Sequence, residues 1–591
     1  MQEQEITLPT RDNYTQLTAL LLIVAGALLF LSFGYTEMAG SDMWWHVAAG
    51  RELVQTKTLW MVDDWSYSAL GKDWLNHEWL SDIIFYSWVS AGGVESLVYW
   101  KWLVLVTTFA TLQHVLSRDS GSPFAGLLCA GVAMAIAAPF LDVRPHIYSL
   151  LNFSVLLFLL LGRQTKTWLL ATLFVVWVNL HGGFFFGLMA LGILVFPWRD
   201  CGPMILGILG IPSGDGSPNR FCSRFRAALL VGVICLLAAA LNPSGFKTFL
   251  YPLKYAFDDS SPFRQLGEWL SPFQPGGIRS PLFFVFMWVP VIALVYLLPR
   301  VRKTVAVPWE GIVLTALTLA MALTSRRFIP LFGMSLAVMM APLVGLCFRK
   351  VQGQKLAVVL ALGALVFSAW RMLPYPLKSG PAFHYLTAEY SYPVDMLNFI
   401  EVNGLQGKVY ALYNWGGYIH WRTDGDLKVF IDGRADTIYD ADTYNHYVQV
   451  LISSPDWIEK LEATRPDYVL WPQLLKSGQQ KLQQLLETGR WRPVYRDSVS
   501  WLLARASLKF PDGMTAAPDT PWRDLTIGQI SAWTGKIDRA IEYGEKTRQA
   551  IPWHKGACNL LTETYRGMGE EDKADNILQQ CRGYFPSAML R

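Results

Sequence analysis

Apolar runs long enough to cross a membrane constrain this chain more than any other feature. A helix needs about 20 mostly apolar residues to span a bilayer, and such runs recur through the first 371 residues. We expect eleven spans, at about 16–34, 94–114, 123–139, 146–162, 168–181, 183–197, 227–241, 281–299, 308–324, 328–346 and 356–371. Only 16% of the residues are charged, against about 25% in soluble domains. The chain is therefore predicted to be a polytopic α-helical membrane protein.

The basic residues of alternate loops predict the orientation in the membrane, because cytoplasmic loops carry an excess of Lys and Arg. Thirteen of them fall on one side: Arg118, Arg163, Lys166, Arg199, Arg220, Arg224, Arg226, Arg300, Arg302, Lys303, Arg349, Lys350 and Lys355. This places the N-terminus in the cytoplasm. No basic segment or small-residue cleavage site marks a signal peptide, so residues after 371 are expected outside a cytoplasmic (inner) membrane, in the periplasm.

Polar residues that are unusual near spans all fall on the predicted outer side. They are Asp42, His46, Asp63, Asp64, His77, Glu78, Arg144, His146, Asn179, His181, Asn242, Glu268, Arg326 and Arg327. Ionisable residues at a membrane mouth indicate a functional site. Because these residues did not define the sidedness, their gathering predicts one outer polar site.

The chain changes character after the last span. Residues 385–510 predict a soluble α/β domain, with strands at 408–413, 427–432, 467–471 and 498–504 and helices at 393–403, 441–463 and 474–488. The glycine-bearing motifs "WGGY" and "DGRAD" are expected to be turns, although Asp432 and Arg434 could face the membrane site.

Residues 521–591 carry an internal repeat. Gly535 and Gly569, Ala540 and Ala574, and Pro552 and Pro586 are each 34 apart, which is the tetratricopeptide period. We expect two such helix pairs, able to dock a partner, although Ser531 stands where Tyr is usual.

Cys558 and Cys581 fall on the two helices of the last repeat. The sequence is compatible both with a disulfide between them and with two buried free thiols.

Short motifs of the first 505 residues resemble the GT-C superfamily of glycosyltransferases. An Asp follows the first span in "GSDMWWHVAAG", and a long first outer loop, 35–93, contains predicted surface helices. This superfamily includes protein O-mannosyltransferases and bacterial lipid A aminoarabinose transferases. "DMWWH", "NHEWL", "RPH", "NLHGG", "NPSG", "EW", "RRF", "WGGY" and "DGRAD" together also resemble a branch of bacterial membrane proteins assigned only in general terms as glycosyltransferases. The predicted domains are 1–371, GT-C-like with this loop; 385–510; and 521–591.

The resemblance implies a cell-envelope enzyme that moves a sugar from a polyprenyl phosphate to a glycan, lipid or protein acceptor with inversion. It implies a catalytic carboxylate, Asp42, with Asp64 and Glu78 as further candidates, because Met43 stands where the family often has Glu. The leaving phosphate would meet Arg326, Arg327 and Arg144. The expected sugar and acceptor pocket comprises Trp44, Trp45, His46, His77, His146, Asn179, His181, Asn242 and Glu268. No metal-ligand spacing occurs, although a divalent metal on Asp42, Asp64 and Glu78 is compatible with the sequence.

Each of these residues could instead have a purely structural role. The arginine pair could anchor helices at the interface, the histidines could be packing residues, and Glu78 could merely begin a helix. Two other functions are open: a transporter of a glycan or lipid-linked intermediate, or a membrane scaffold that docks partners through its repeats. Transporters place ionisable residues within spans, whereas here they gather at one face. A nucleic-acid partner is not expected at a net charge of +4.

Overall fold

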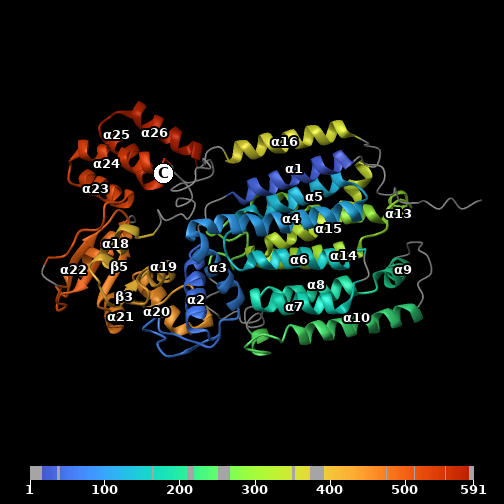
Figure 1. The fold of residues 1–591 in the computed structure, drawn as a ribbon, viewed down its shortest axis with the longest axis horizontal. Helices are drawn as coiled ribbons and strands as arrows, with labels where there is room; N and C mark the ends of the chain where they lie inside the picture. Colours follow the sequence, from blue (N-terminus) through green and yellow to red (C-terminus); the bar gives the residue numbers. More distant parts are fainter. Residues whose placement is uncertain are drawn as a thin grey trace, which may run out of the picture. The chain divides into compact units, whose positions relative to one another are not determined.

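A computed structural model describes residues 16–35, 40–162, 165–208, 218–250, 262, 266–348, 353–372, 392–473, 476–510, 513–552 and 554–584. The chain divides into two compact units (Figure 1). Unit 1 comprises Met1–Thr36 and Tyr99–Met372, and unit 2 comprises Glu37–Val98 and Leu373–Arg591. Unit 2 thus combines the first long loop with the C-terminal residues, which the sequence analysis assigned to separate domains.

Unit 1 is built from helices. Its elements are α1 (Gln16–Gly34), α4 (Leu97–Ser120), α5 (Pro123–Ala137), η3 (Ala138–Phe140), α6 (His146–Leu160), α7 (Thr167–Leu180), α8 (Phe184–Val195), α9 (Trp198–Ile208), α10 (Pro218–Ala238), α12 (Pro281–Phe286), η5 (Val289–Leu297), α13 (Pro299–Arg302), α14 (Trp309–Thr324), η6 (Arg326–Phe328), α15 (Ile329–Phe348) and α16 (Gln354–Met372). Each predicted span overlaps helical elements, and the span at 281–299 contains α12 followed by the 3₁₀ helix η5.

Apolar length separates these helices into two groups. Within the described residues, five helices are long and apolar enough to cross a membrane, or six if the bent pair α8 and α9 forms one span. Four shorter apolar helices, His146–Leu160, Thr167–Leu180, Pro281–Leu297 and Trp309–Thr324, accompany them. Unit 1 is therefore a multi-pass membrane region, and the number of eleven spans stays a prediction.

Small residues set the closest helix contacts of unit 1. A Cβ at Gly333 of α15 would lie 3.1 Å from the carbonyl oxygen of Ala133 in α5, and one at Gly311 of α14 would lie 2.9 Å from the backbone of α15. Helices in a bilayer associate through such close packing. The Tyr296 hydroxyl donates to the carbonyl of Met339 at 2.7 Å and ties η5 to the same core.

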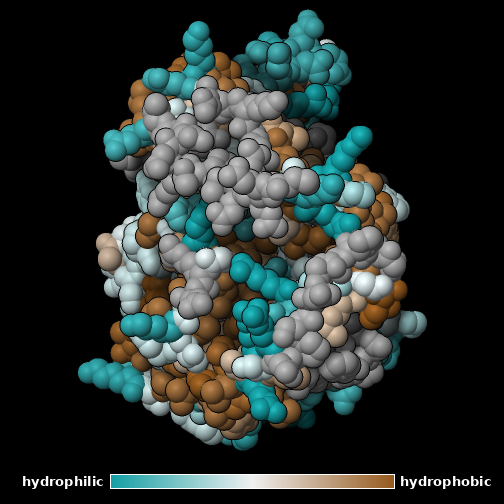
Figure 2. All heavy atoms as spheres, turned by 90° about the vertical axis from the view of Figure 1, so that its right-hand side faces the viewer, coloured by the Kyte–Doolittle hydropathy of each residue, from teal (hydrophilic) through white to brown (hydrophobic). Residues whose placement is uncertain are grey.

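The polypeptide turns sharply between α8 and α9, whose axes differ by 73°. Figure 2 looks at the end of unit 1 that carries α9 and α13, where hydrophilic side chains gather among apolar ones. This is the end that the basic loops predict to be cytoplasmic.

Unit 2 contains helices α2 (Asp42–Thr56) and α3 (Trp79–Gly92) and the short hairpin β1 (Met61–Val62) and β2 (Asp73–Trp74) from the first loop, with η2 (Val94–Ser96) after them. Its sheet has the order β4-β3-β5-β7-β6. The strands are β3 (Gly407–Ala411), β4 (Leu427–Val429), β5 (Tyr468–Pro472), β6 (Trp491–Arg496) and β7 (Ser500–Arg505). β3 pairs in parallel with β4 and β5, whereas β7 is antiparallel to β5 and β6.

Residues 63–68 of the first loop lie along the edge of this sheet. Ser66 forms a parallel bridge with Val429. Val429 donates its N–H to the carbonyl of Trp65, and Tyr67 donates to the carbonyl of Val429, both at 3.0 Å. The loop thereby covers the exposed edge of β4, which would otherwise present unpaired backbone groups.

The helices of the α/β region are α18 (Val394–Val402), α19 (Tyr413–Thr423), η9 (Ala435–Thr437), α20 (Ala441–Leu451), α21 (Trp457–Ala463) and α22 (Lys476–Glu487). "WGGY" lies inside α19, so its expected turn is wrong. A Cβ at Gly417 would lie 2.9 Å from Trp45, and one at Gly416 would lie 2.5 Å from Asp432. The glycines therefore serve the close packing of α19 against α2 and the 431–432 segment.

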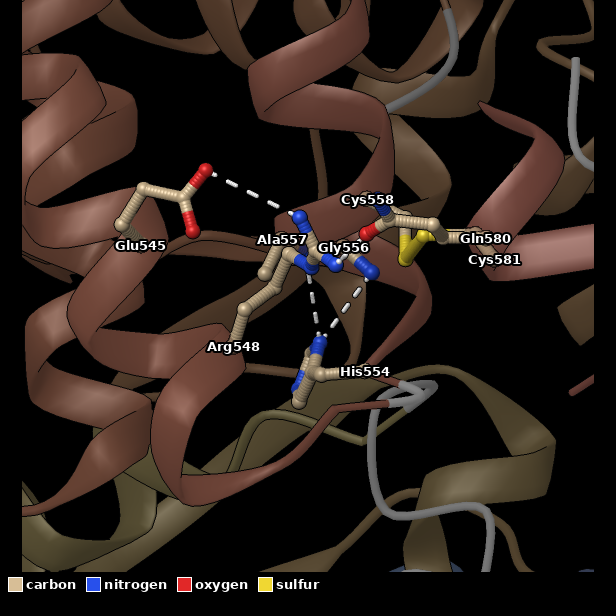
Figure 3. The surroundings of a disulfide bond; sticks show 8 residues. All are labelled: Glu545, Arg548, His554, Gly556, Ala557, Cys558, Gln580 and Cys581. Carbon is tan, nitrogen blue, oxygen red and sulfur yellow. Dashed lines mark hydrogen bonds and ion pairs between the residues drawn. A yellow bond between two sulfur atoms is a disulfide. The ribbon is translucent and has the colours of Figure 1, made fainter. Parts of the chain in front are cut away.

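Four helices follow the sheet: α23 (Pro521–Trp533), α24 (Ile537–Ala550), α25 (Lys555–Gly567) and α26 (Glu571–Tyr584). Gly535 and Gly569 have φ of +74° and +77° at the turns between paired helices, where glycine is favoured. Cys558 and Cys581 form a disulfide between α25 and α26 (Figure 3). Beside it, Arg548 donates to the Gln580 side chain at 2.6 Å. The assignment to the tetratricopeptide family stays a prediction.

Candidate functional site

Two polar clusters, one in each unit, contain most of the predicted site residues. In unit 1, Arg144 and Arg327 share a single carboxylate. The two nearest distances from their guanidinium nitrogens to Glu268 oxygens are 2.5 and 3.3 Å. Burial alone would raise the pKa of Glu268, but the charges of Arg144 and Arg327 outweigh it and lower the pKa to about 2. We call Arg144, Arg327 and Glu268 the arginine pair site; it carries an excess of positive charge.

His181 extends the arginine pair site. Its Nδ1 accepts from the Gly183 N–H at 2.9 Å and lies 2.7 Å from the Ser149 hydroxyl, which accepts from the Trp177 indole at 2.8 Å. These donors leave the ring proton of a neutral His181 on Nε2, which lies 3.3 Å from an Arg327 nitrogen. Because both of these groups are then donors, this contact is not a hydrogen bond. A Cβ at Gly183 would lie 2.2 Å from the Ser149 hydroxyl oxygen, so "HGG" permits this close packing.

Arg326 has a different environment from Arg327. Its side chain is buried, and its guanidinium donates to the backbone carbonyls of Ser271, Gln274 and Gly276. Arg327 instead keeps a 28% exposed side chain and stacks over Trp269 at 4.8 Å. Arg326 thus braces the 271–276 turn, whereas the guanidinium of Arg327 stays partly accessible.

Three further predicted pocket residues of unit 1 bond mainly to backbone. His146 Nε2 lies 2.7 Å from the carbonyl of Phe140. Asn179 donates to the carbonyl of Leu241 at 2.9 Å, and Asn242 donates to the Asn179 side-chain oxygen at 3.1 Å. The two asparagines join the end of α7 to the turn after α10.

Asp42 begins α2 in unit 2, where the helix dipole favours a carboxylate. Its side chain is half-buried. The Ser41 hydroxyl donates to it at 3.4 Å. A Cβ at Gly433 would lie 3.2 Å from the carboxylate and 2.9 Å from Trp45. The "DGRAD" segment can therefore approach Asp42 closely, because Gly433 has no side chain.

A buried pair lies one turn further along α2. His46 Nδ1 lies 2.6 Å from Asp82 of α3, and Asn76 donates to the other Asp82 oxygen at 2.7 Å. Burial raises the pKa of Asp82 well above its usual range. Glu78 lies 3.9 Å from His46 and 3.6 Å from His77. The sequence analysis missed Asp82, although its place in the first turn of α3, four residues after Glu78, was a signal.

Arg434 forms the most enclosed cluster of unit 2, with 0% exposure of the three charged side chains. Its guanidinium lies 2.6 Å from Asp63 and 2.8 Å from Asp432, between the rings of Trp65 and Trp74 at 4.3 and 4.9 Å. We call Arg434, Asp63 and Asp432 the aspartate pair knot. It joins the first loop to the α/β region and carries an excess of negative charge.

The remaining candidates of the first loop are Trp44, Trp45 and Asp64. Trp44 and Trp45 are 2% and 8% exposed; Trp44 packs on Tyr418 and Trp45 on His46, which leaves no ring face for a sugar. Asp64 is exposed, and its carbonyl accepts from Lys428. No group of three His, Cys, Asp or Glu that could hold a metal occurs in the described part of the chain, so Asp42, Asp64 and Glu78 do not converge.

Comparison with known proteins gives a likeness in fold. No protein-family model and no curated protein matches the sequence. Among solved structures, the archaeal oligosaccharyltransferase AglB from Archaeoglobus fulgidus, in complex with an inhibitory peptide and a dolichol-phosphate, matches with a TM-score of 0.50 and 11% identity, covering 94% of this chain and 86% of that chain. The chain therefore shares its overall fold with this oligosaccharyltransferase, in agreement with the fold that the motifs led us to expect.

Proposed function

We propose that this protein is an integral membrane glycosyltransferase that moves a sugar from a polyprenyl-phosphate donor to an acceptor, with inversion at the sugar. The arginine pair site is the observation that carries the proposal. Two arginines share one glutamate and therefore retain affinity for an anion, within a fold also found in an enzyme solved with dolichol-phosphate. Planar guanidinium groups suit a phosphate through paired N–H donors.

The roles expected from the sequence define the proposed reaction. The acceptor hydroxyl or amine attacks the anomeric carbon, and its proton passes to Asp42 as general base. The bond from that carbon to the phosphate oxygen breaks, and its electron pair leaves with the phosphate. Arg144 and Arg327 stabilise the charge that develops there, while Glu268 holds Arg327 in position.

Asp42 is preferred as the base because it combines partial exposure with a fixed position at a helix start. Asp63, Asp82 and Asp432 are buried and already paired. Glu78 is retained as a neighbour that orients His46 and His77. The α/β region and the helix repeats are proposed to position the acceptor or an assembly partner on the outer side of the membrane.

The test is Asp42→Asn, which keeps the shape of the side chain and removes the base. We expect at least about a hundredfold loss of glycan product in cells with normal membrane levels of the protein. Asp73→Asn, in an exposed carboxylate of the same loop, is the matched control and should leave the product unchanged. Unchanged product in Asp42→Asn would refute this base. Loss in Asp64→Asn instead would transfer the role to Asp64, and loss in neither would favour a transporter or scaffold.

A further inference from the structure

A cavity of about 300 Å³ lies in unit 1, away from the arginine pair site in the sequence and on other helix ends. It is formed where α6 and α8 end and where α9 and α14 begin. Its lining includes Leu160, Phe196, Trp198, Arg199, Arg224 and Glu310. This volume is at the lower end of small-molecule sites, which run from about 300 to 1,000 Å³. No step of the proposed transferase reaction uses it.

Charges of both signs meet in the cavity. Arg199 and Arg224 contribute two guanidinium groups, and Glu310 contributes a carboxylate. Arg224 donates to the buried Asp200 at 2.9 Å, which uses one of its five N–H donors. The charge of Arg199 acts on the carboxylate of Glu310. Two cations are thus balanced by two carboxylates, so a ligand carrying both charges fits better than a simple anion.

Aromatic side chains give the cavity the character of a membrane interface. Trp198 packs on Phe196 with ring centres 4.5 Å apart and is stacked with Trp309 at 6.3 Å. Tryptophan is enriched at the level of lipid headgroups. A Cβ at Gly202 would lie 2.3 Å from Trp309, so a glycine of α9 admits this ring. The cavity lies at the 73° turn between α8 and α9, on the side where the basic loops predict the cytoplasmic surface of the bilayer.

We propose that this cavity binds the zwitterionic headgroup of a phosphatidylethanolamine lipid. The phosphate is held by Arg199 and by the donors of Arg224 that Asp200 does not take. The primary ammonium, with its N–H donors, is held by Glu310 beside the aromatic rings. Basic pockets between membrane helices commonly bind lipid headgroups, and Glu310 selects among them. A choline headgroup lacks N–H donors, and a glycerol headgroup lacks the cation.

The experiment uses the purified full-length protein in detergent, with native lipid removed. Short-chain phosphatidylethanolamine, phosphatidylcholine and phosphatidylglycerol with identical acyl chains are titrated, and bound lipid is followed by native mass spectrometry and thermal unfolding. We expect the ethanolamine lipid to bind about tenfold more tightly than the other two, which is the effect of one charge-assisted hydrogen bond. Soluble O-phosphoethanolamine should compete if the headgroup itself is recognised, whereas failure to compete at any concentration would overturn headgroup recognition.

Variants of the cavity residues, compared with a control variant elsewhere, test whether the lipid binds in this cavity. Glu310→Gln should remove the preference for ethanolamine over glycerol, and Arg199→Gln should weaken both lipids. Arg300→Gln, an exposed arginine on the same predicted side, is the control and should change neither. Equal or tighter binding of the choline or glycerol lipid to the unaltered protein would overturn the proposal even if a variant failed to fold. Loss of binding in Arg300→Gln to the same extent would do so as well.

Discussion

The arginine pair site of unit 1 and the aspartate pair knot of unit 2 combine arginines and carboxylates in opposite ratios. In the first, two arginines with 25% and 28% exposed side chains share Glu268. In the second, Arg434 is enclosed with two aspartates at 0% exposure. A partly exposed excess of cations can still bind an anion, whereas a fully enclosed knot has no room for a ligand. The difference teaches that a conspicuous arginine indicates function only when its charge is left partly unbalanced and accessible.

Removing the cation of the knot should have the largest effect. Arg434→Gln leaves Asp63 and Asp432 buried without a partner, and such a loss costs about 3–5 kcal/mol. We expect unit 2 to unfold at a much lower temperature and to become sensitive to protease. Arg51→Gln is the control, because its partner Asp424 is 77% exposed and such pairs contribute at most about 1 kcal/mol. A stability loss no greater than that of the control would contradict the enclosed knot.

Removing one cation of the arginine pair site should affect activity instead. In Arg327→Gln, Glu268 keeps its contact with Arg144, so folding should be nearly unchanged. Loss of one donor to a developing oxyanion costs about 10²–10³ in rate, and we expect the glycan product to fall accordingly. Arg279→Gln removes an exposed arginine of the 266–280 loop and should retain the product. If Arg327→Gln destabilised the protein as much as Arg434→Gln, the two clusters would be alike and the comparison would fail.

The buried acids of unit 2 should give a smaller, pH-dependent effect. Burial raises the pKa of Asp497 to about 7, although it accepts hydrogen bonds from the N–H groups of Val499 and Ser500. The folded state then binds more protons than the unfolded state between about pH 4 and 7. Stability is therefore highest below this window and falls as pH rises through it, by up to about 1.4 kcal/mol per pH unit.

Asp497→Asn should remove this slope in thermal melts of the full chain recorded between pH 5 and 8. Glu268 gives the contrast, because its pKa is lowered to about 2 and its contribution to stability is lost only below about pH 4.5. Glu268→Gln should therefore leave the slope between pH 5 and 8 unchanged. A slope that persisted in Asp497→Asn would assign it to another buried acid, such as Asp395, whose pKa burial also raises.

The helices of unit 1 were predictable because long apolar runs have few other structures available in a membrane. Four of the five strands in the main sheet were also predicted from continuous or alternating apolar residues. Strand β6 was missed because "WRPVYR" contains Pro493 and two arginines and lies at the sheet edge, where proline is tolerated. The error at "WGGY" arose because glycine pairs suggest a turn locally, whereas here they serve contacts with residues far away in the chain.

The candidate site was predictable in residue type more than in role. Adjacent residues such as Asp63 and Asp64, or Arg326 and Arg327, have the same local chemistry, and only tertiary packing decides which is buried. The position of Asp82 in the first turn of α3 was a signal in the sequence, but its pairing was not, because its partner, His46, lies on another helix. The three residues of the arginine pair site and His181 come from four separate segments of the chain. Their predicted position on the outer side of the membrane suggested that they lie near one another, but it could not predict which of them form pairs.

Residues 63–68, which line β4, have a consequence for synthesis of the protein. Their partner at Val429 is made more than 360 residues later, after every helix of unit 1. At about 5–20 residues per second, the first loop waits on the order of 20–70 s before its strand mate exists. During this interval Trp65 and Trp74 lack the contacts that bury them in the folded protein. We therefore expect a chaperone to shield this loop during synthesis.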